Sequence, residues 1–297
     1  DNFMGDDIPR PGSILKSLNK MLKIKSSLAL YKAFYQWIGQ PGMLVFPAKQ
    51  TLEWADVYPF LYLHASFEGL QQSKRIKHLV IDEMQDYTPI QYAVINHLFP
   101  CPKTILGDFG QFINPNHLNT IEDLRRQYSE ASLVELTKSY RSTYEIITFA
   151  KQIQQTARLE PIERHGPTPQ MIPSEDTRDE IRKIKKAIKT FQESGYASMG
   201  IILKTNKKAA AVHKQLSRDH KIHLISPEST SFTNGISITS IQMSKGLEFD
   251  EVIILDADSE TYKTQYDKGL LYIAATRAMH QLTILYTGSP SPYLPKK

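Results

Sequence analysis

The period of apolar and polar positions changes near residue 76 and divides the chain into a helical part and an α/β part. Before residue 76, apolar side chains recur every three or four residues, which predicts helices. They are expected to begin after Ser13, over Ser27–Ile38, and from Asp56 to Gly69 with Pro59 in the first turn. We expect residues 1–75 to form a helical segment. Its tyrosines and phenylalanines are expected to pack inside, although aromatic rings could also stack on nucleic-acid bases.

From residue 76 onward, short apolar runs alternate with helical patterns, which predicts largely parallel sheets. Strands are expected at residues 76–81, 104–106 and 132–136, with helices at 90–98 and from about residue 143. The Pro-rich stretch 156–176 predicts a domain boundary. After it, we expect an amphipathic helix near residues 181–191 with a solvated basic face. Further strands are expected at 199–203, 236–240, 252–255 and 282–286.

The run Leu79–Asp86 has the most informative polarity pattern in the chain. Its apolar half has the composition of a fully buried parallel strand, and its polar half carries Asp82, Glu83 and Asp86. The carboxyl ends of such strands are where open α/β sheets place ligands. Carboxylates at that edge would suit Mg²⁺ on a nucleoside triphosphate. The alternative is a buried strand that runs into an acidic, solvated loop.

Composition narrows the class of protein without identifying it. A chain of 297 residues is long enough for two domains, and no apolar run is long enough for a membrane span. The single cysteine, Cys101, excludes an intrachain disulfide and a cysteine-based metal site, which is consistent with a reducing, cytoplasmic environment. A net charge of +5 is compatible with a polyanionic partner.

Five polar motifs follow in a fixed order, at strand ends or at helix starts. They are Asp82–Asp86, Gly107–Gln111, Tyr140–Ser142, Ser244–Asp250 and Tyr272–Ala278. Together they resemble the motifs of UvrD-like superfamily-one helicases, from about residue 76 to the C-terminus. The resemblance implies RecA-like parallel sheets of the P-loop NTPase type, with ATP bound in a cleft between two such domains. The expected division is a helical insertion at 1–75, the C-terminal half of a first RecA-like domain at 76–155, and a complete second domain at 156–297.

The resemblance also assigns roles, which make chemical sense for phosphoryl transfer. Asp82 would hold Mg²⁺, and Glu83 would act as the general base or orient the attacking water. Gln111 resembles the γ-phosphate sensor, because an amide can donate to phosphate while it accepts from water. Arg141 and Arg277 resemble the two arginines that stabilise the charge on the γ-phosphate.

The remaining nucleotide contacts implied by the resemblance come from three further residues. Glu248 would bind the ribose, Tyr140 would flank the adenine, and Gly246 lies in the same motif as Glu248.

Taken singly, each of these residues has a simpler interpretation. Arg141 could cap a helix or pair with Asp108, and Arg277 could be an exposed helical arginine. Glu248 and Asp250 could form an acidic turn before a strand. The order and spacing of all five motifs favour the functional interpretation.

Two departures from the family pattern refine the expectation. No glycine in the chain is followed by lysine, so the G-x-x-x-x-G-K-[ST] phosphate loop is absent from this sequence. We therefore expect this to be the C-terminal part of a longer ATPase that binds ATP poorly by itself and does not turn it over. In addition, residues 112–117 contain no tryptophan, where the DNA helicases of this family stack one on a base.

The second departure, together with the sequence Asp86–Gln91 and the predicted helix before Gly69, resembles the HelD branch of the family. That resemblance implies an ATP-driven protein that acts on DNA, single-stranded or at a transcription bubble, and that releases and recycles RNA polymerase. The alternative is a conventional 3′–5′ DNA helicase of repair or recombination. Neither implies a membrane.

Overall fold

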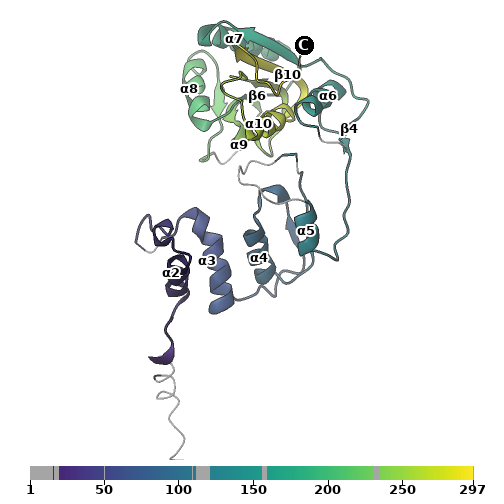
Figure 1. The fold of residues 1–297 in the computed structure, drawn as a ribbon. Helices are drawn as coiled ribbons and strands as arrows, with labels where there is room; N and C mark the ends of the chain where they lie inside the picture. The colour runs from purple at the N-terminus through teal and green to yellow at the C-terminus, as the bar shows by residue number, and fades with distance from the viewer. Residues whose placement is uncertain are drawn as a thin grey trace, which may run out of the picture. The chain divides into compact units, whose positions relative to one another are not determined.

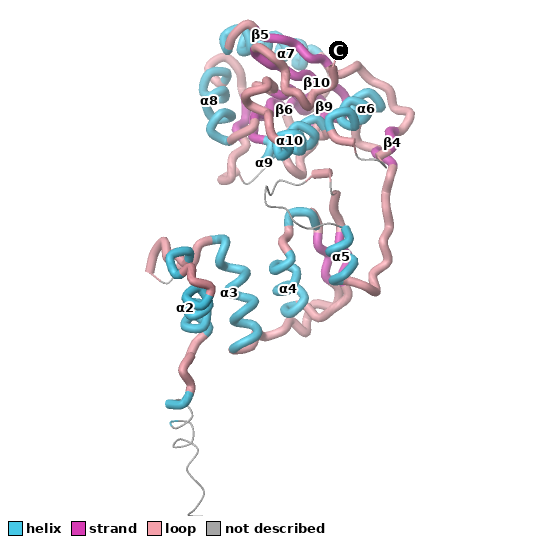
Figure 2. Tube along the Cα trace, viewed as in Figure 1, coloured by secondary structure: helices cyan, strands magenta, loops and turns pink. Residues whose placement is uncertain are grey.

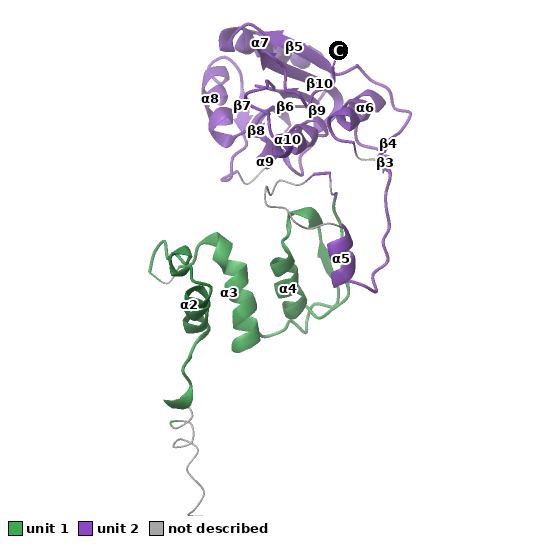
Figure 3. Ribbon diagram, viewed as in Figure 1, with its two compact units in different colours: residues 1–107 green, residues 108–297 purple. Residues whose placement is uncertain are grey.

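The computed structural model describes residues 16, 20–49, 51–108, 110–111, 121–155, 159–229 and 234–296. These residues fall into two compact units, Asp1–Gly107 and Asp108–Lys297, which are shown in different colours in Figure 3. The helix predicted after Ser13 and the segment 112–117 without tryptophan lie almost wholly outside the described residues. Each unit is described by itself.

The first unit combines a helical hairpin with a small parallel sheet (Figure 1). Its described elements, in chain order, are α2 (Ser27–Trp37), η2 (Pro41–Met43), α3 (Trp54–Phe67), β1 (Leu79–Ile81), η3 (Met84–Asp86), α4 (Pro89–Leu98) and β2 (Lys103–Ile105). Strands β1 and β2 pair in parallel, with Val80 opposite Thr104. Helix α4 begins at a capping box between Thr88 and Gln91, with Pro89 in its first turn.

Helices α2 and α3 pack antiparallel around buried polar groups. At one end, Ser27 donates to Glu68 from both its backbone amide and its hydroxyl, each at 2.5 Å. In the middle, the hydroxyls of Tyr31 and Tyr35 both donate to Asp56, at 2.7 and 2.6 Å. The prediction that the aromatic side chains of this segment pack inside is confirmed for Tyr31, which is buried, and is wrong for Phe34 and Tyr62, which are exposed. Pro59 lies inside α3 rather than in its first turn, because the helix begins two residues earlier than predicted.

Strand β1 is not fully buried, which corrects the sequence-based expectation. Ile81 is buried, whereas 60% of Val80 is exposed. Among the described residues, β1 pairs only with β2 in a two-stranded sheet, so the alternate side chains of this strand face different surroundings.

The second unit is an α/β domain built on one six-stranded sheet, whose strands are magenta in Figure 2. The strand order is β5-β10-β9-β6-β8-β7, and all neighbouring strands are parallel. The strands are β5 (Gln170–Ser174), β6 (Ser198–Leu203), β7 (Ile222–Leu224), β8 (Gly235–Ser240), β9 (Phe249–Ile254) and β10 (Ala278–Thr287). The helices are α5 (Ile121–Gln127), α6 (Tyr144–Ile153), α7 (Thr177–Glu193), α8 (Asn206–Leu216), α9 (Ile241–Ser244) and α10 (Gln265–Ala275). A separate short pair joins β3 (Lys138–Ser139) to β4 (Glu160–Pro161).

Each face of this sheet carries its own hydrophobic cluster. One cluster combines α7 and α8 with strand residues such as Ile201 and Ile253. The other combines α6, α9 and α10 with alternate residues such as Ile202 and Ile254. Successive residues of a strand therefore pack into the clusters on opposite faces of the sheet. Because both faces are buried, these strands are continuous apolar runs in the sequence. Helix α6 belongs to the core of this unit through residues such as Ile146 and Phe149.

Most of the predicted α/β pattern is confirmed, with exceptions that have physical reasons. The strand predicted at residues 132–136 is wrong. Residues 131–137 are irregular, and Val134 and Leu136 are exposed there. The predictions also missed β5, β7 and α8. The three-part domain division remains a prediction, and the compact units divide instead after Gly107.

Candidate active site

Glu83 adopts a left-handed backbone conformation, with φ of 54° and ψ of 46° directly after β1. This conformation is unfavourable for a residue with a Cβ atom, and such strain concentrates at functional sites. Hydrogen bonds from several groups hold the turn. The Glu83 amide donates to Asp82 Oδ1 at 2.7 Å, Gln85 Nε2 donates to Glu83 Oε2 at 2.7 Å, and the Met84 amide donates to Leu106 O at 2.9 Å. The two carboxylates are thus presented by a fixed turn at the carboxyl end of a strand.

Gly107 allows the end of β2 to approach this turn closely. A Cβ atom at Gly107 would lie 2.4 Å from Gln85 Oε1 and 2.8 Å from the Met84 amide nitrogen. Gln85 is completely buried, and its amide is the group that contacts Glu83. Because Gly107 has no side chain, Gln85 can occupy the place from which it donates to Glu83, the candidate catalytic residue.

In the second unit, Gln111 has an oriented side-chain amide. Its Nε2 donates to Asp108 Oδ2 at 2.9 Å, and its Oε1 accepts from Arg277 Nη2 at 2.5 Å. Asp108 also accepts from the Gly110 amide at 2.7 Å, which fixes the carboxylate itself. The structure therefore brings together two of the predicted catalytic residues, Gln111 and Arg277. Asp108 was not predicted in this role, although its position three residues before Gln111 in a polar loop was a usable signal.

Arg277 is a buried residue rather than the exposed helical arginine considered as the alternative. Only 2% of it is accessible to solvent. It lies between α10 and β10, where Nε donates to Ile273 O at 3.1 Å and Nη1 to Leu247 O at 3.4 Å. These bonds fix the plane of the guanidinium and leave Nη2 directed at Gln111 and at the hydroxyl of Thr276.

Arg141 forms an ion pair with Glu248, with 2.6 Å between Nη2 and Oε1. Each side chain is 40% exposed, so the pair is accessible to solvent. The sequence suggested Asp108 as a possible structural partner of Arg141, and the partner found is instead another candidate site residue. A half-exposed pair of this kind contributes little stability, about 0–1 kcal/mol, and can exchange for a ligand.

The loop that carries Arg141 is tied to the start of β10, next to Arg277. Ser142 Oγ donates to Ala278 O at 2.5 Å, and the Thr143 amide donates to Met279 O at 3.1 Å. Arg164 reinforces the connection, since its Nη2 donates to Arg141 O and, at 3.4 Å, to Met279 O. These hydrogen bonds therefore connect the loop of Arg141 to the residues that directly follow Arg277. No sequence signal identified Arg164.

Glu248 and Arg277 directly precede β9 and β10, so this cluster lies at the amino ends of two neighbouring strands. Gly246 has φ of +81°, a conformation that favours glycine, in the turn between α9 and β9. Tyr140 is 68% exposed in the loop after β3, where its ring is open to a planar ligand.

Asp250 has a structural role. Its Oδ2 accepts from the amides of Ala197 and Ser198, which joins β9 to the start of β6.

Asp82 and Glu83 belong to the first unit, and the other candidates belong to the second. In the described parts of the chain, no group of three or more His, Cys, Asp or Glu side chains is arranged to hold a metal. The two neighbouring carboxylates of Asp82 and Glu83 still fit Mg²⁺, because this ion usually binds through one or two carboxylates together with water and phosphate oxygens. The exposed carboxylate of Asp82 is the group that would hold it.

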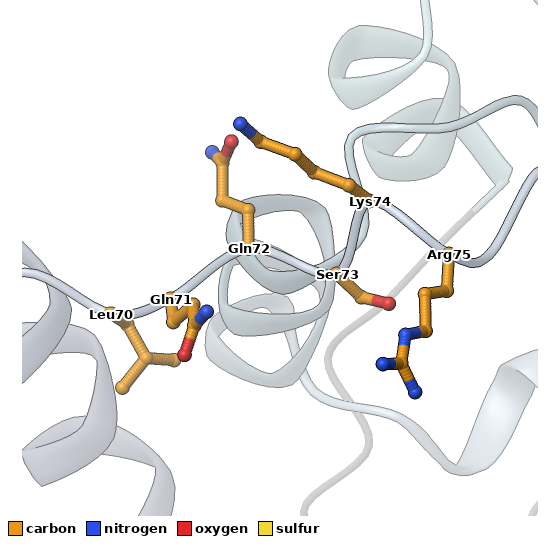
Figure 4. Close-up of a pocket in the computed structure, with 6 residues that line it drawn as sticks. All are labelled: Leu70, Gln71, Gln72, Ser73, Lys74 and Arg75. Atoms are coloured by element: carbon orange, nitrogen blue, oxygen red, sulfur yellow. The ribbon is translucent and has the colours of Figure 1, made fainter.

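A hollow in the first unit lies along the extended segment after α3 and is unrelated to these residues. It is lined by Leu70, Gln71, Gln72, Ser73, Lys74 and Arg75, and Figure 4 shows these side chains spread along the segment. None of the candidate site residues lines it.

Part of the second unit is similar to a known protein family. Residues 235–285, from β8 into β10, match the family described as the UvrD-like helicase C-terminal domain. The matched segment contains Gly246, Glu248 and Arg277.

Several curated proteins are similar over about half of the chain. The protein named "Putative ATP-dependent DNA helicase YjcD" of Bacillus subtilis (strain 168) is 25% identical over 162 residues, 49% of this chain and 21% of YjcD. The ATP-dependent DNA helicase UvrD1 of Mycobacterium tuberculosis (strain ATCC 25618 / H37Rv) is 24% identical over 166 residues, 49% of this chain and 22% of UvrD1. The chain thus spans about a fifth of the length of these relatives.

A solved structure is also similar. It is the C-terminal domain of a possible DNA helicase from Lactobacillus plantarum WCFS1, with 29% sequence identity and a TM-score of 0.45. The aligned region covers 52% of this chain and 91% of the solved chain. Within the described residues, no helix combines the length and the hydropathy that a bilayer-crossing segment needs.

Proposed function

We propose that this chain is the C-terminal motor portion of an ATP-dependent DNA helicase or translocase. The observation that carries the proposal is the linked set Asp108–Gln111–Arg277, with the Arg141–Glu248 pair tied to the same segment through Ser142 and Arg164. Two guanidinium groups and an oriented amide suit the charge that spreads over a transferring phosphoryl group. The helicase C-terminal family match over 235–285 supports the same assignment.

In this proposal, the residues of the first unit act on the metal and the water. Asp82 would hold Mg²⁺, and the ion would neutralise charge on the phosphates. Glu83 accepts a proton from the attacking water or orients it, and Gln85 keeps its carboxylate in place through the 2.7 Å hydrogen bond. The strained backbone at Glu83 is the structural cost of this placement.

The residues of the second unit act on the nucleotide. Arg277 and Gln111 contact the γ-phosphate, while Asp108 holds the Gln111 amide. Arg141 exchanges its ion pair with Glu248 for phosphate oxygen, which frees Glu248 for the ribose hydroxyls. Tyr140 flanks the base, and Gly246 shapes the turn that carries Glu248. Because the Arg141–Glu248 pair is solvent-exposed, this exchange costs little free energy.

The finer proposal is that the motor acts on RNA polymerase, in the manner of HelD. It is supported by the sequence Asp86–Gln91, which here forms the end of η3 and the capping box of α4, and by helix α3 before Gly69. A conventional 3′–5′ DNA helicase of repair or recombination is the alternative. Either target would place the protein in the cytoplasm.

The test is the steady-state ATPase rate of the full-length protein, measured with single-stranded DNA and separately with core RNA polymerase. Stimulation by DNA alone, with a steep dependence on salt, would support the repair helicase. Salt-tolerant binding to the polymerase with little effect of DNA would support the HelD-like motor. A full-length protein that hydrolyses no ATP with either partner would contradict the proposal.

A further inference from the structure

Both tryptophans of the chain lie at one end of the α2–α3 hairpin, and both are exposed. Trp37 is the last residue of α2 and Trp54 is the first residue of α3. The helices are antiparallel, because Ser27 contacts Glu68 whereas Tyr35 contacts Asp56. The two indoles therefore share one end of the hairpin, 82% and 74% exposed. We call this surface, with Met43 and Phe46 of the connection, the tryptophan end.

Each indole is supported from within the hairpin. The ring of Phe34 lies 6.3 Å from that of Trp37, and the ring of Tyr58 lies 5.7 Å from that of Trp54 in an edge-to-face arrangement. Since these tilted and edge-to-face contacts leave most of each indole exposed, the rings are available to stack against a further flat group.

Three charged residues flank the tryptophan end: Lys32 on α2, Lys49 in the connection, and the exposed Glu53 directly before Trp54. Residues 11–52 contain six lysines and no aspartate or glutamate. All six lysines are described and exposed, and none of them forms an ion pair within the described residues. Four of them precede Ser27, at the opposite end of the hairpin, so Lys32 and Lys49 are the two that lie near the tryptophan end. Lys32 Nζ lies 5.2 Å above the ring of Phe46. The surface thus combines exposed aromatic rings with two lysines and one glutamate.

We propose that the tryptophan end binds single-stranded DNA. Bases stack on Trp37 and Trp54, and the sugar–phosphate backbone lies against the lysines around them. Aromatic platforms set in a positive surface are how proteins hold single strands without reading sequence. The inference deepens the proposed function and rests on it, since the strand is the DNA on which the motor acts. The proposal places the aromatic rings that stack on the bases, Trp37 and Trp54, in the first unit.

The structure provides a direct probe for this proposal. Trp37 and Trp54 are the only tryptophans in the sequence, so all of the tryptophan fluorescence of the 297-residue chain originates at this surface. We would titrate the chain, without nucleotide, with a 20-nucleotide oligo(dT) and follow both tryptophan emission and the anisotropy of an end-labelled strand. We expect saturable quenching that follows the same binding curve as the anisotropy.

Variants separate stacking from charge. Trp37→Leu and Trp54→Leu each leave one tryptophan as the reporter, and each is expected to weaken binding at least about fivefold. Lys32→Glu combined with Lys49→Glu should lower the salt dependence of binding. The matched control is Lys186→Glu with Lys189→Glu, which makes the same charge change on exposed positions of α7 and should leave quenching unchanged. Circular dichroism would confirm that each variant folds.

Binding of the strand without quenching, or quenching that the leucine variants leave intact, would overturn the inference. A failure of the strand to bind would also overturn it. A blue shift of tryptophan emission on anionic phospholipid vesicles, without any response to the strand, would overturn it as well and would indicate a membrane contact. None of these results involves nucleotide. The proposed ATP chemistry would stand or fall separately, on the ATPase of the full-length protein.

Discussion

Arg277 and Gln111 are 166 positions apart in the sequence, and the guanidinium of one donates to the side-chain oxygen of the other at 2.5 Å. Asp108 holds the opposite end of the same amide. This chain of three side chains joins a polar loop after β2 to the connection between α10 and β10. Two of the three residues that the family resemblance assigns to the γ-phosphate are therefore joined by a direct hydrogen bond.

The first prediction concerns Gln111→Ala in the full-length protein. Removal of the amide takes away one donor to the γ-phosphate and releases Arg277 Nη2 from its partner. We expect the rate of ATP hydrolysis to fall about 100-fold, as it does when one donor to a transition-state anion is lost. The melting temperature should change little, because Gln111 is only partly buried. A rate within twofold of the wild type would contradict the assigned role.

The second prediction separates backbone strain from function at Glu83. Glu83→Gly and Glu83→Ala both lack the carboxylate, so both should be inactive. Glycine accepts φ of 54° without a steric penalty, whereas alanine does not. We expect the glycine variant to be more stable than the alanine variant by about 1 kcal/mol in urea denaturation. Equal stability of the two would show that the left-handed turn is unstrained.

The third prediction concerns Gly107, whose missing side chain lets β2 approach the turn of Gln85. Gly107→Ala places a Cβ atom 2.8 Å from the Met84 amide, and a shift of backbone in a packed region costs about 1–3 kcal/mol. Gly42→Ala is the control, because a Cβ atom there meets no atom within 4 Å. Denaturant unfolding should show the loss of stability only for Gly107→Ala. A neutral Gly107→Ala variant would contradict the tight packing of this turn.

The fourth prediction is a pH dependence of stability that arises at Glu180, a buried residue of α7. Burial raises the pKa of this carboxyl to about 7 from its ordinary 4.5, with further effects from Asp256, Lys208 and Asp258. The unfolded chain releases the proton near pH 4.5, and the folded chain holds it until pH 7. The stability from this group is therefore complete below pH 4.5 and is lost as the pH rises towards 7, by about 3 kcal/mol.

Glu180→Gln keeps an oxygen that can accept from the Asp256 amide, the bond that Glu180 makes at 3.2 Å. This variant should not show that decline between pH 4.5 and 7. Unfolding curves for the two proteins across this range provide the measurement. Parallel pH profiles would show that Glu180 ionises normally in the folded state.

Much of the fold could be predicted because its signals are local. Helix α4 was predicted from its apolar spacing, and β6, β8, β9 and β10 from apolar runs whose two faces are both covered. Residues 132–136 were misjudged because an apolar run does not reveal whether a neighbouring strand exists. Strand β7 has only three residues, too few for a clear period. Helix α8 has a polar, lysine-rich first turn, although Thr205 as its N-cap was a usable signal.

The candidate site was predictable in its residue types and not in its contacts. The motif order identified Arg141, Glu248, Gln111 and Arg277. It did not predict that they would pair as they do, because pairs separated by more than a hundred residues depend on the packing of the whole sheet. Neither the left-handed conformation of Glu83 nor the bridge made by Arg164 has a local sequence signature.

The most direct test of the central claim is a single-turnover measurement of ATP hydrolysis by the full-length protein carrying Glu83→Gln, with saturating single-stranded DNA. The substitution keeps the size of the side chain and one oxygen that can accept from Gln85 Nε2, but removes its basicity. The account predicts ATP binding at wild-type affinity, with hydrolysis reduced at least about 100-fold, the lower range for loss of a general base. Hydrolysis near the wild-type rate would contradict the assignment of Glu83 and, with it, the proposed mechanism.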